Sequence, residues 1–503
     1  MDNEERIRHQ KKLAKVFYEM GMDLDLIEQI SGVKKEEIKR DFCIDIDKQT
    51  IYNSLRNSKN DSYSEPRDRG NRWYGSNPSN SRCLIPSKFN LIDKRKHRFS
   101  YDFLSAGSFL FFMQEESIMA KLFTSESVGP GHPDKICDQV SDAILDACMA
   151  QDPMSRVACE CFTTNELFVV GGEITTKAVV NYEEIVRNTL RKIGYTDKSL
   201  GIGADTCKVQ VVITTQSPDI AQGVDSALDD NETGAGDQGI MFGYATDETP
   251  AYMPLPIFLS HRLVERADVL RKSGEFKSAR PDMKSQVTVD YANPSDIKIV
   301  SVLMSIQHDP DFNEAEFKAY IKENVIDYVM KQYNLNLDYS VLINPTGRFV
   351  VGGPEGDTGL TGRKIIVDTY GGTAAHGGGA FSGKDCTKVD RSAAYMARYI
   401  AKNLVAAGVA ERLQIQLAYA IGVSQPTSIN VKGYESAKFT YDEIVSCIRA
   451  LFPLTPNGII KCFDLRRPIY EQTATYGHFG RDDLDLPWEK LDKVEQIKSY
   501  FGL

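Results

Sequence analysis

The sequence contains no uninterrupted apolar run of about 18 residues, the length that a helix needs to cross a membrane. The nearest candidate, residues 99–113, is short and is broken by Ser, Asp and Gly. An N-terminal secretory signal is also missing, and the ten cysteines include no Cys-x-x-Cys pair. Cys159 and Cys161 instead alternate along an expected strand. These absences predict a cytoplasmic protein with reduced thiols and no membrane span.

Two common catalytic signatures are missing as well. The sequence shows neither a nucleophile elbow nor an evident Ser-His-Asp constellation. A P-loop is approached by the spacing of Gly378, Gly383 and Lys384, but Asp385 replaces the Ser or Thr hydroxyl that would bind Mg²⁺. This spacing alone leaves an ATP-dependent phosphotransferase open as an alternative.

The charge of the chain is unevenly distributed. The whole sequence has a net charge of −10, and its 503 residues predict about three domains. Residues 1–118 carry 21 Lys and Arg against 19 Asp and Glu, so the remaining 385 residues have a net charge of −12. A body this acidic makes nucleic acid an unfavourable partner. An anionic ligand would therefore require cations that gather locally.

Residues 376–391 read HGGGAFSGKDCTKVDR and are the most informative stretch. Consecutive glycines let a backbone approach a ligand where a Cβ would collide. Lys384, Lys388 and Arg391 follow closely, as suits an oligophosphate. Asp390 stands at an expected helix start, where it could hold the Mg²⁺ that accompanies such a ligand.

A second motif consists of Gly131, His132, Pro133, Asp134 and Lys135. Proline suits the first turn of a helix, and apolar residues recur every four positions behind it. Free N–H groups and the dipole favour anions at a helix N-terminus. Alone, this pattern is more typical of an ordinary capped helix start. Together with the glycine stretch, it predicts the opposite wall of a polyphosphate pocket.

From Met119 onward the chain resembles the bacterial S-adenosylmethionine synthetases (methionine adenosyltransferases). The motifs that carry this resemblance follow the order of the family and span nearly all of residues 119–503. They are FTSESV (123–128), GHPDK (131–135), GGEIT (171–175), QSPDI (216–220), GAGDQG (234–239), RPDMKSQV (280–287), NPTGRF (344–349), GLTGRK (359–364), the glycine stretch and YGHFG (476–480).

The resemblance implies an α+β fold of three similar βαββαβ-type domains related by pseudo-threefold symmetry. The corresponding ranges are 119–218, 233–351 and 352–503, with a flexible lid at 219–232. It also implies a homodimer that pairs into a homotetramer. The expected reaction is attack of the methionine sulfur on C5′ of ATP, followed by hydrolysis of the released triphosphate. Because a thioether needs no deprotonation, the missing base constellation fits this chemistry.

The same resemblance assigns roles to individual residues. The catalytic groups would be His132, Lys135, Lys284, Arg363, Lys384 and Asp237. The ATP contacts would be His132, Asp282, Lys284, Arg348, Phe349, Asp357, Arg363, Lys364, Ala380 and Lys384. Methionine would contact Glu173, Gln216, Asp357 and Lys388. Two Mg²⁺ per site would bind Asp134 and Asp390, and one K⁺ per subunit would bind Glu160. The lid would include Gln216, Gly223 and Leu228.

Several of these residues have simpler explanations without the family. Glu173 after two glycines is typical of a solvated hairpin, and Glu160 of a strand residue facing an arginine. Phe349 beside two valines is more often a core residue than an adenine platform. His376 and His478 receive no role, and His261 and His308 are expected as plain helix and strand residues.

Hydrophobic periodicity predicts the secondary structure of the body. Strands are expected at 156–162, 166–170 and 208–214, with two more within 287–307. The strand at 208–214 would have a β-branched core of Val209, Val211, Val212 and Ile213. Helices are expected at 181–193, 254–273, 314–333 and 389–410.

Residues 1–118 do not fit the body. Residues 1–52 have the residue pattern of a small helical segment, possible as a helix-turn-helix. Residues 53–118 form a polar linker rich in Ser, Asn and Arg, which we expect to be disordered. We favour an upstream reading frame joined to a synthetase that starts at Met119. A DNA-binding regulator with a ligand-sensing body remains the alternative, and salt-sensitive DNA binding would distinguish it.

Overall fold

The computed structural model describes residue 28 and residues 33–34, 120–215 and 234–503. The chain divides into two units, Met1–Leu110 and Phe111–Leu503. The expected helix-turn-helix and linker lie outside the described residues, apart from Glu28, Val33 and Lys34. Within the described ranges, none of the helices is both long and apolar enough to span a membrane. The eight cysteines described there are all free, and seven of them are buried.

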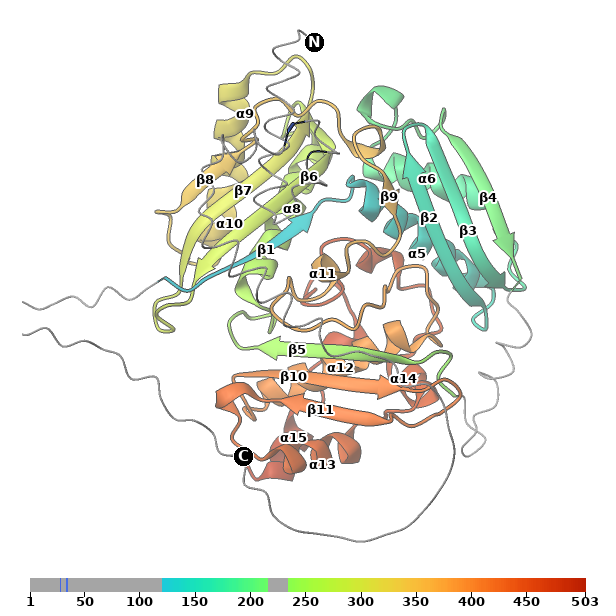
Figure 1. Cartoon of the computed structure of the whole chain (residues 1–503), viewed down its shortest axis with the longest axis vertical. Coiled ribbons are helices and arrows are strands. Elements are labelled where there is room, and N and C mark those ends of the chain that lie inside the picture. The colour runs from blue at the N-terminus through green and yellow to red at the C-terminus, as the bar shows by residue number, and fades with distance from the viewer. Residues whose placement is uncertain (1–27, 29–32, 35–119, 216–233) are drawn as a thin grey trace, which may run out of the picture. The chain divides into compact units, whose positions relative to one another are not determined.

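Three sheets organise the second unit, two of them mixed and one antiparallel (Figure 1). The first has the strand order β1 (Leu122–Val128), β6 (Ala279–Asp290), β7 (Lys298–His308) and β8 (Ser340–Ile343). The second has the order β4 (Lys208–Thr214), β3 (Leu167–Thr175), β2 (Arg156–Thr164) and β9 (Gly359–Leu360). The third has the order β11 (Ser428–Lys432), β10 (Arg412–Tyr419) and β5 (Gly239–Thr246). β3 and β4 pair in parallel, as do β7 and β8, whereas the other pairs are antiparallel.

Helices cover one face of each sheet. The first sheet packs against α8 (Leu255–Ser273), which contacts the continuous helical run α9 (Glu314–Tyr320), η2 (Ile321–Ile326) and α10 (Asp327–Gln332). The second packs against α5 (Pro133–Gln151) and α6 (Tyr182–Ile193). The third carries α12 (Val389–Ala406) and α13 (Tyr441–Leu451), with α14 (Pro456–Phe463) and α15 (Val494–Phe501) against α12. The short helices are η1 (Lys198–Leu200), η3 (Gly353–Glu355), α11 (Ile365–Asp368), η4 (Tyr434–Ser436), η5 (Glu471–Thr473) and η6 (Pro487–Glu489).

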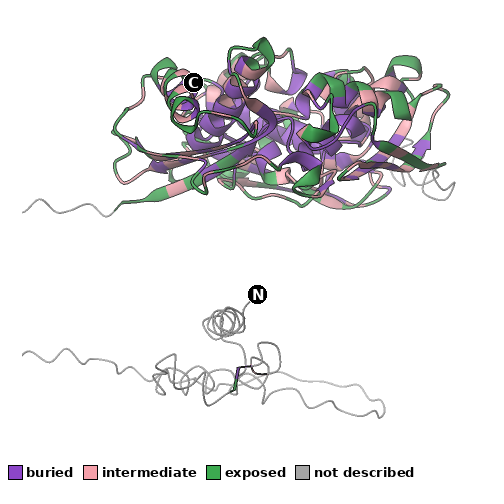
Figure 2. Cartoon of the chain, turned by 90° about the horizontal axis from the view of Figure 1, so that it is seen from above, coloured by how far each residue is buried: buried purple, intermediate pink, exposed green. Residues whose placement is uncertain are grey.

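The buried residues gather in the helices and on the helix-facing sides of the sheets, while much of the outer sheet surface is exposed (Figure 2). The strand β4 is an example of this exposure. Its bounds agree with the predicted strand, and Val209 and Ile213 pack against the core as expected. Val211 and Val212 are 42% and 53% exposed, so the expected β-branched core was wrong at these two positions. The strand forms the edge of its sheet, and period-2 patterning does not tell which sheets are covered on both faces.

Most other predicted elements are confirmed with shifted ends. Asn181 caps α6 by accepting a hydrogen bond from Glu184 N at 3.2 Å, and Gly194 ends the helix at φ 113°. The expected helix at 314–333 contains a π-helical segment, η2. α12 ends at Ala406, four residues before the predicted end.

The sheets do not follow the predicted domain ranges, which remain a prediction. β1 lies in residues 119–218 but pairs with β6 of residues 233–351. β5 lies in 233–351 but pairs with β10 of 352–503, and β9 returns from 352–503 to pair with β2. Each sheet therefore ties together segments that are distant in sequence.

Candidate active site

α5 begins at the predicted pentapeptide. Pro133 is its first residue, and Nδ1 of the N-cap residue His132 accepts a hydrogen bond from Asp134 N at 3.2 Å. His132 is 3% exposed. Burial, followed by the charges of Lys364 and Lys284, lowers the pKa of His132 from 6.5 to about 3. The ring is therefore neutral near pH 7, and its proton lies on Nε2 because Nδ1 is an acceptor.

The low pKa of His132 makes stability depend on pH. An unfolded chain takes up a proton below pH 6.5, whereas folded His132 stays neutral down to its pKa of about 3. The free energy of unfolding therefore decreases as the pH falls through this window, by up to about 1.4 kcal/mol per pH unit. We expect His132→Asn, which keeps an N-cap acceptor, to reduce this decrease in urea unfolding between pH 7 and pH 5. Equal slopes for the two proteins would contradict a neutral buried His132.

Four aspartates recur every four residues along α5, at positions 134, 138, 142 and 146. Each accepts a hydrogen bond from a backbone N–H of the C-terminal part of the chain: Asp134 from Leu360 (3.0 Å), Asp138 from Gly362 (2.8 Å), Asp142 from Gly383 (2.8 Å) and Asp146 from Glu471 (2.8 Å). We call this set the aspartate row. It fixes the GLTGRK segment (359–364) and the glycine stretch (376–391) on one helix. Only Asp134 of this row was predicted as a site residue, although the spacing of four is visible in the sequence.

Lys135 lies within this arrangement. It is fully buried, and its Nζ donates to Asp138 at 3.0 Å and to Asp368 at 2.5 Å. Burial opposes its charge, but the two carboxylates outweigh burial and raise the pKa of Lys135. The ammonium group is charged and engaged with carboxylates rather than exposed to a pocket. Its predicted phosphate contact stays a prediction.

The three glycines of the glycine stretch meet different surroundings. A Cβ at Gly377 would lie 1.6 Å from the Ile240 carbonyl oxygen, and one at Gly379 would lie 2.4 Å from Cγ of Asp390. Gly378 has φ +93° and open space around it. Two glycines are therefore required by close packing within the protein, and the third by its backbone conformation. The close approach of a ligand to this backbone stays a prediction.

Asp385, at the position of the missing P-loop hydroxyl, points into the protein. It is fully buried, and it accepts hydrogen bonds from Val157 N at 2.7 Å and Thr387 N at 2.9 Å. Lys388 donates to it at 2.6 Å. This carboxylate holds the loop against β2, which explains why the P-loop pattern fails at this position.

The end of the glycine stretch carries an ion pair. Asp390 lies in the first turn of α12, and its Oδ2 is 2.5 Å from Nζ of Lys384. The next residue, Arg391, is buried and donates to both oxygens of Asp142, at 2.6 and 2.9 Å. Arg391 also donates to the carbonyl oxygens of Phe381 and Lys384, at 3.0 and 3.3 Å. Asp142 and Arg391 together hold the loop that presents Lys384.

A further group of charges comes from β6 and the segment after β8. Asp282 is buried and accepts a hydrogen bond from Gly353 N at 2.9 Å. Burial raises the pKa of Asp282 to about 6, although that hydrogen bond and the charge of Lys284 lower it and the charge of Asp357 raises it. Lys284 and Asp357 are exposed and lie within electrostatic range of the buried carboxyl.

The groups meet around the start of α5. Lys364 donates to Asp134, and Nε of Arg363 lies 3.9 Å from the same carboxylate. A Cβ at Gly362 would lie 2.5 Å from the Cβ of Ala380, so the GLTGRK segment contacts the glycine stretch. The predicted site residues that gather here are His132, Asp134, Asp282, Lys284, Asp357, Arg363, Lys364 and Ala380. Lys384 and Asp390 pair with each other at the end of the glycine stretch.

Other predicted residues lie outside this group. Glu160 and Glu173 are exposed on β2 and β3, and their register places both on the same face of the sheet. Glu173 lies within β3, the second strand of the β2–β3 hairpin, as its simpler explanation predicted. Asp237 is exposed and accepts from its neighbour Gln238 N at 2.7 Å. Arg348 is exposed and Phe349 half-buried. The lid residues Gln216, Gly223 and Leu228 lie outside the described residues.

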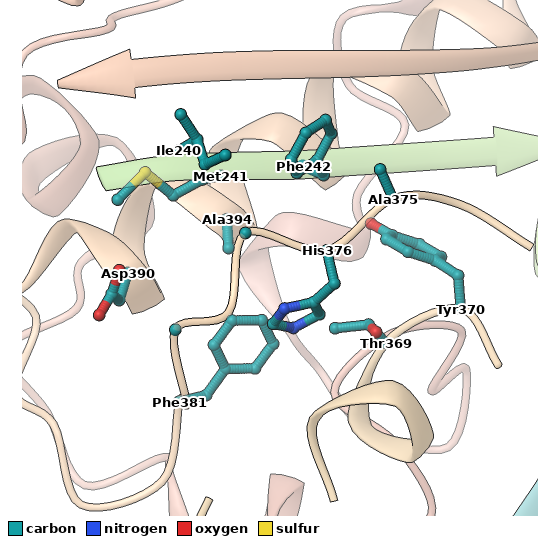
Figure 3. A pocket seen from close by; sticks show the side chains of 12 residues that line it. Ile240, Met241, Phe242, Thr369, Tyr370, Ala375, His376, Phe381, Asp390 and Ala394 are labelled. Carbon is teal, nitrogen blue, oxygen red and sulfur yellow. The ribbon is translucent and has the colours of Figure 1, made fainter. Parts of the chain in front are cut away.

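A small pocket lies between β5 and the glycine stretch (Figure 3). Its lining is mostly apolar and includes Ile240, Met241, Phe242, His376, Phe381 and Asp390. Nδ1 of His376 accepts a hydrogen bond from Gly378 N at 2.8 Å. The cavity volume is about 10 Å³, which is room for about one water molecule.

Comparison with known proteins covers the same part of the chain. Models of the N-terminal, central and C-terminal domains of S-adenosylmethionine synthetase match residues 120–218, 232–349 and 351–490. S-adenosylmethionine synthase from Mycoplasma capricolum is 59% identical over 385 residues, which are 76% of this chain and 98% of the relative. The proteins of that name from Mesoplasma florum and Clostridium botulinum are 60% and 55% identical, over 76% of this chain and 100% of each relative. The chain belongs to the S-adenosylmethionine synthetase family.

Proposed function

We propose that this protein is a methionine adenosyltransferase, which converts ATP, L-methionine and water into S-adenosyl-L-methionine, phosphate and diphosphate. The methionine sulfur attacks C5′ of ATP, and the released triphosphate is then hydrolysed. The observation that carries this proposal is the neutral, buried His132 at the start of α5, where Lys364 from a distant segment binds the carboxylate of Asp134. A second ion pair, Lys384 with Asp390, lies at the end of the glycine stretch. Identities of 55–60% over 98–100% of the relatives support it.

His132 is suited to the leaving group. A thioether attacks without losing a proton, so the first step needs no general base. The neutral ring donates from Nε2, because Asp134 N occupies Nδ1. We assign this N–H to the oxygen that leaves C5′, where negative charge develops as the bond breaks.

Cations around the glycine stretch would receive the triphosphate. Lys284, Arg363, Lys364 and Lys384 are the members of this group. One opposite-charge pair at about 4 Å is worth about 4 kcal/mol at an effective dielectric near 20 but only about 1 kcal/mol in water. Exclusion of water is therefore part of the mechanism, and we assign it to the predicted lid at 219–232.

The remaining assignments concern the substrates. The adenine ring would stack on Phe349, and the nucleotide would also contact Asp282, Arg348, Asp357 and the backbone of Ala380. Methionine would contact Glu173, Gln216, Asp357 and Lys388. Lys135 and Asp237 complete the proposed catalytic set. Glu160 and Glu173 share one face of the sheet, which allows both to serve a site at that face.

The carboxylates of Asp134 and Asp390 fit Mg²⁺. Among the described residues no group of three or more His, Cys, Asp or Glu side chains could hold a metal. Mg²⁺ is commonly bound through one or two carboxylates and completed by substrate phosphates and water. Asp134 and Asp390 each have a lysine partner that such an ion would replace. We propose two Mg²⁺ per site, which supply positive charge to the triphosphate oxygens, and one K⁺ per subunit at Glu160.

The open sheet faces support assembly. Exposed apolar side chains occur on five strands: Leu122 of β1, Val212 of β4, Ile240 of β5, Val300 of β7 and Leu342 of β8. Apolar side chains on open sheets favour an interface between subunits. We propose a homodimer that pairs into a homotetramer, with the three domains related by pseudo-threefold symmetry. The free cysteines support a cytoplasmic location.

Product analysis tests the proposal. Purified protein would be supplied with ATP, methionine, Mg²⁺ and K⁺, and the products followed by phosphorus NMR and mass spectrometry. We expect equal amounts of S-adenosylmethionine, diphosphate and phosphate, without ADP. ADP without a methionine adduct would establish a phosphotransferase instead. If the full chain shows no turnover, the same assay on a chain beginning at Met119 tells whether residues 1–118 block activity.

A further inference from the structure

His308 holds Phe349 by two hydrogen bonds. It is the last residue of β7 and is fully buried. Its backbone N–H donates to the carbonyl oxygen of Phe349 at 3.0 Å. In return, Phe349 N–H donates to Nε2 of the His308 ring at 2.9 Å. One residue thus fixes both backbone polar groups of Phe349.

The partners of the ring define its protonation. Nδ1 lies 2.8 Å from the carbonyl oxygen of Asp309, which can only accept, so Nδ1 carries the proton. Nε2 is then the acceptor that Phe349 N–H requires. The ring also packs against Phe312, with centroids 3.6 Å apart and the ring planes tilted by 30°, and it meets Phe317 edge-on. Its orientation is therefore fixed from both sides.

The next residue is held in the same way. The carbonyl oxygen of Val350 accepts from Gln307 Nε2 at 2.9 Å and from Arg280 Nη1 at 3.4 Å. Gly352 lies beneath Phe349, since a Cβ there would come within 2.9 Å of Cε2 of the ring. The half-buried aromatic ring is supported on one side and its backbone cannot shift freely.

We infer that His308 is a positioning residue for the nucleotide: its neutral ring fixes Phe349 so that the aromatic side chain can receive adenine. This inference rests on the proposed adenine contact of Phe349. A purely structural His308 would affect every activity of the protein alike. A positioning role affects substrates that carry adenine and spares those that do not.

The natural comparison is ATP against inorganic tripolyphosphate, which enters the second half of the proposed reaction without adenine. For His308→Ala we expect KM for ATP to rise about tenfold, which corresponds to about 1.4 kcal/mol. We expect kcat to change less than threefold and KM for tripolyphosphate less than twofold. His308→Gln, whose side-chain oxygen can accept from Phe349 N–H, restores most of the ATP affinity. His308→Asn is polar but too short to reach that N–H, and it behaves like alanine.

Phe349→Leu measured in parallel separates the possible failures. If it leaves KM for ATP unchanged, the adenine role of Phe349 is wrong and the inference falls with it. If it raises KM for ATP while His308→Ala and His308→Asn do not, the inference alone is overturned. Equal losses for ATP and tripolyphosphate would also overturn it. If His308→Ala does not fold, the difference between the Asn and Gln variants decides.

Discussion

Replacing Lys384 by methionine lowers kcat for S-adenosylmethionine formation by about 100- to 1,000-fold, the usual cost of one preorganised charge contact. The reason is its position: Nζ lies 2.5 Å from Asp390 and projects from the glycine stretch. Methionine keeps the length of the side chain but removes its charge. Steady-state kinetics with ATP and methionine, at saturating Mg²⁺ and K⁺, measure the effect.

A matched control is Lys192, which forms an ion pair with Glu471 at 2.6 Å on the surface. Lys192→Met also removes a paired ammonium, but exposed pairs contribute only about 0–1 kcal/mol. We expect its kcat to stay within twofold of the parent. A loss of less than fivefold in Lys384→Met would rule out a direct role in charge stabilisation.

Replacing Arg391 by methionine lowers the free energy of unfolding by about 3–5 kcal/mol, because Asp142 is left buried without its counter-charge. Both oxygens of Asp142 accept from this guanidinium, at 2.6 and 2.9 Å. Urea unfolding monitored by circular dichroism gives the change. We further expect KM for tripolyphosphate to rise about tenfold, since a lost charged hydrogen bond of about 1.5–3 kcal/mol no longer fixes the Lys384 loop.

Arg398 is the control on the same helix. It is fully buried and donates to Glu489 at 2.9 and 3.0 Å, and its other partners are carbonyl oxygens of Tyr244, Ala251 and Tyr252. Arg398→Met should destabilise the fold to a similar extent without changing KM for tripolyphosphate. A rise in KM for both variants would show that the effect of Arg391 is global rather than local.

The motifs and several element bounds were predictable because they depend on local chemistry. α6 has a capping asparagine and a terminating glycine. Residues 131–135 contain the N-cap and the first turn of α5. The charged residues of the candidate site were found through motifs whose order matches the family. Several of them lie together around the start of α5, whereas their roles and the joining of the Lys384–Asp390 pair to the same site remain predictions.

What the sequence did not reveal depends on long-range pairing. β1 pairs with β6 across more than 150 residues, and nothing in either strand specifies the other. Val212 has the β-branched apolar side chain typical of a buried strand, but it is exposed in this sheet. Asp385 looked like a failed P-loop position, yet its partner Val157 N is supplied by a distant strand. Such partners are fixed by the fold and are invisible to local patterns.

The aspartate row has a consequence for the newly synthesised chain. Asp134 is separated from its donor Leu360 by 226 residues. At about 5–20 residues per second, a ribosome adds that length in roughly 10–45 s. During this interval α5 carries four carboxylates on one side without the N–H groups that later bind them. On the nascent chain these carboxylates therefore lack their partners, and β9 can complete the sheet of β2, β3 and β4 only after residues 359–360 have been synthesised.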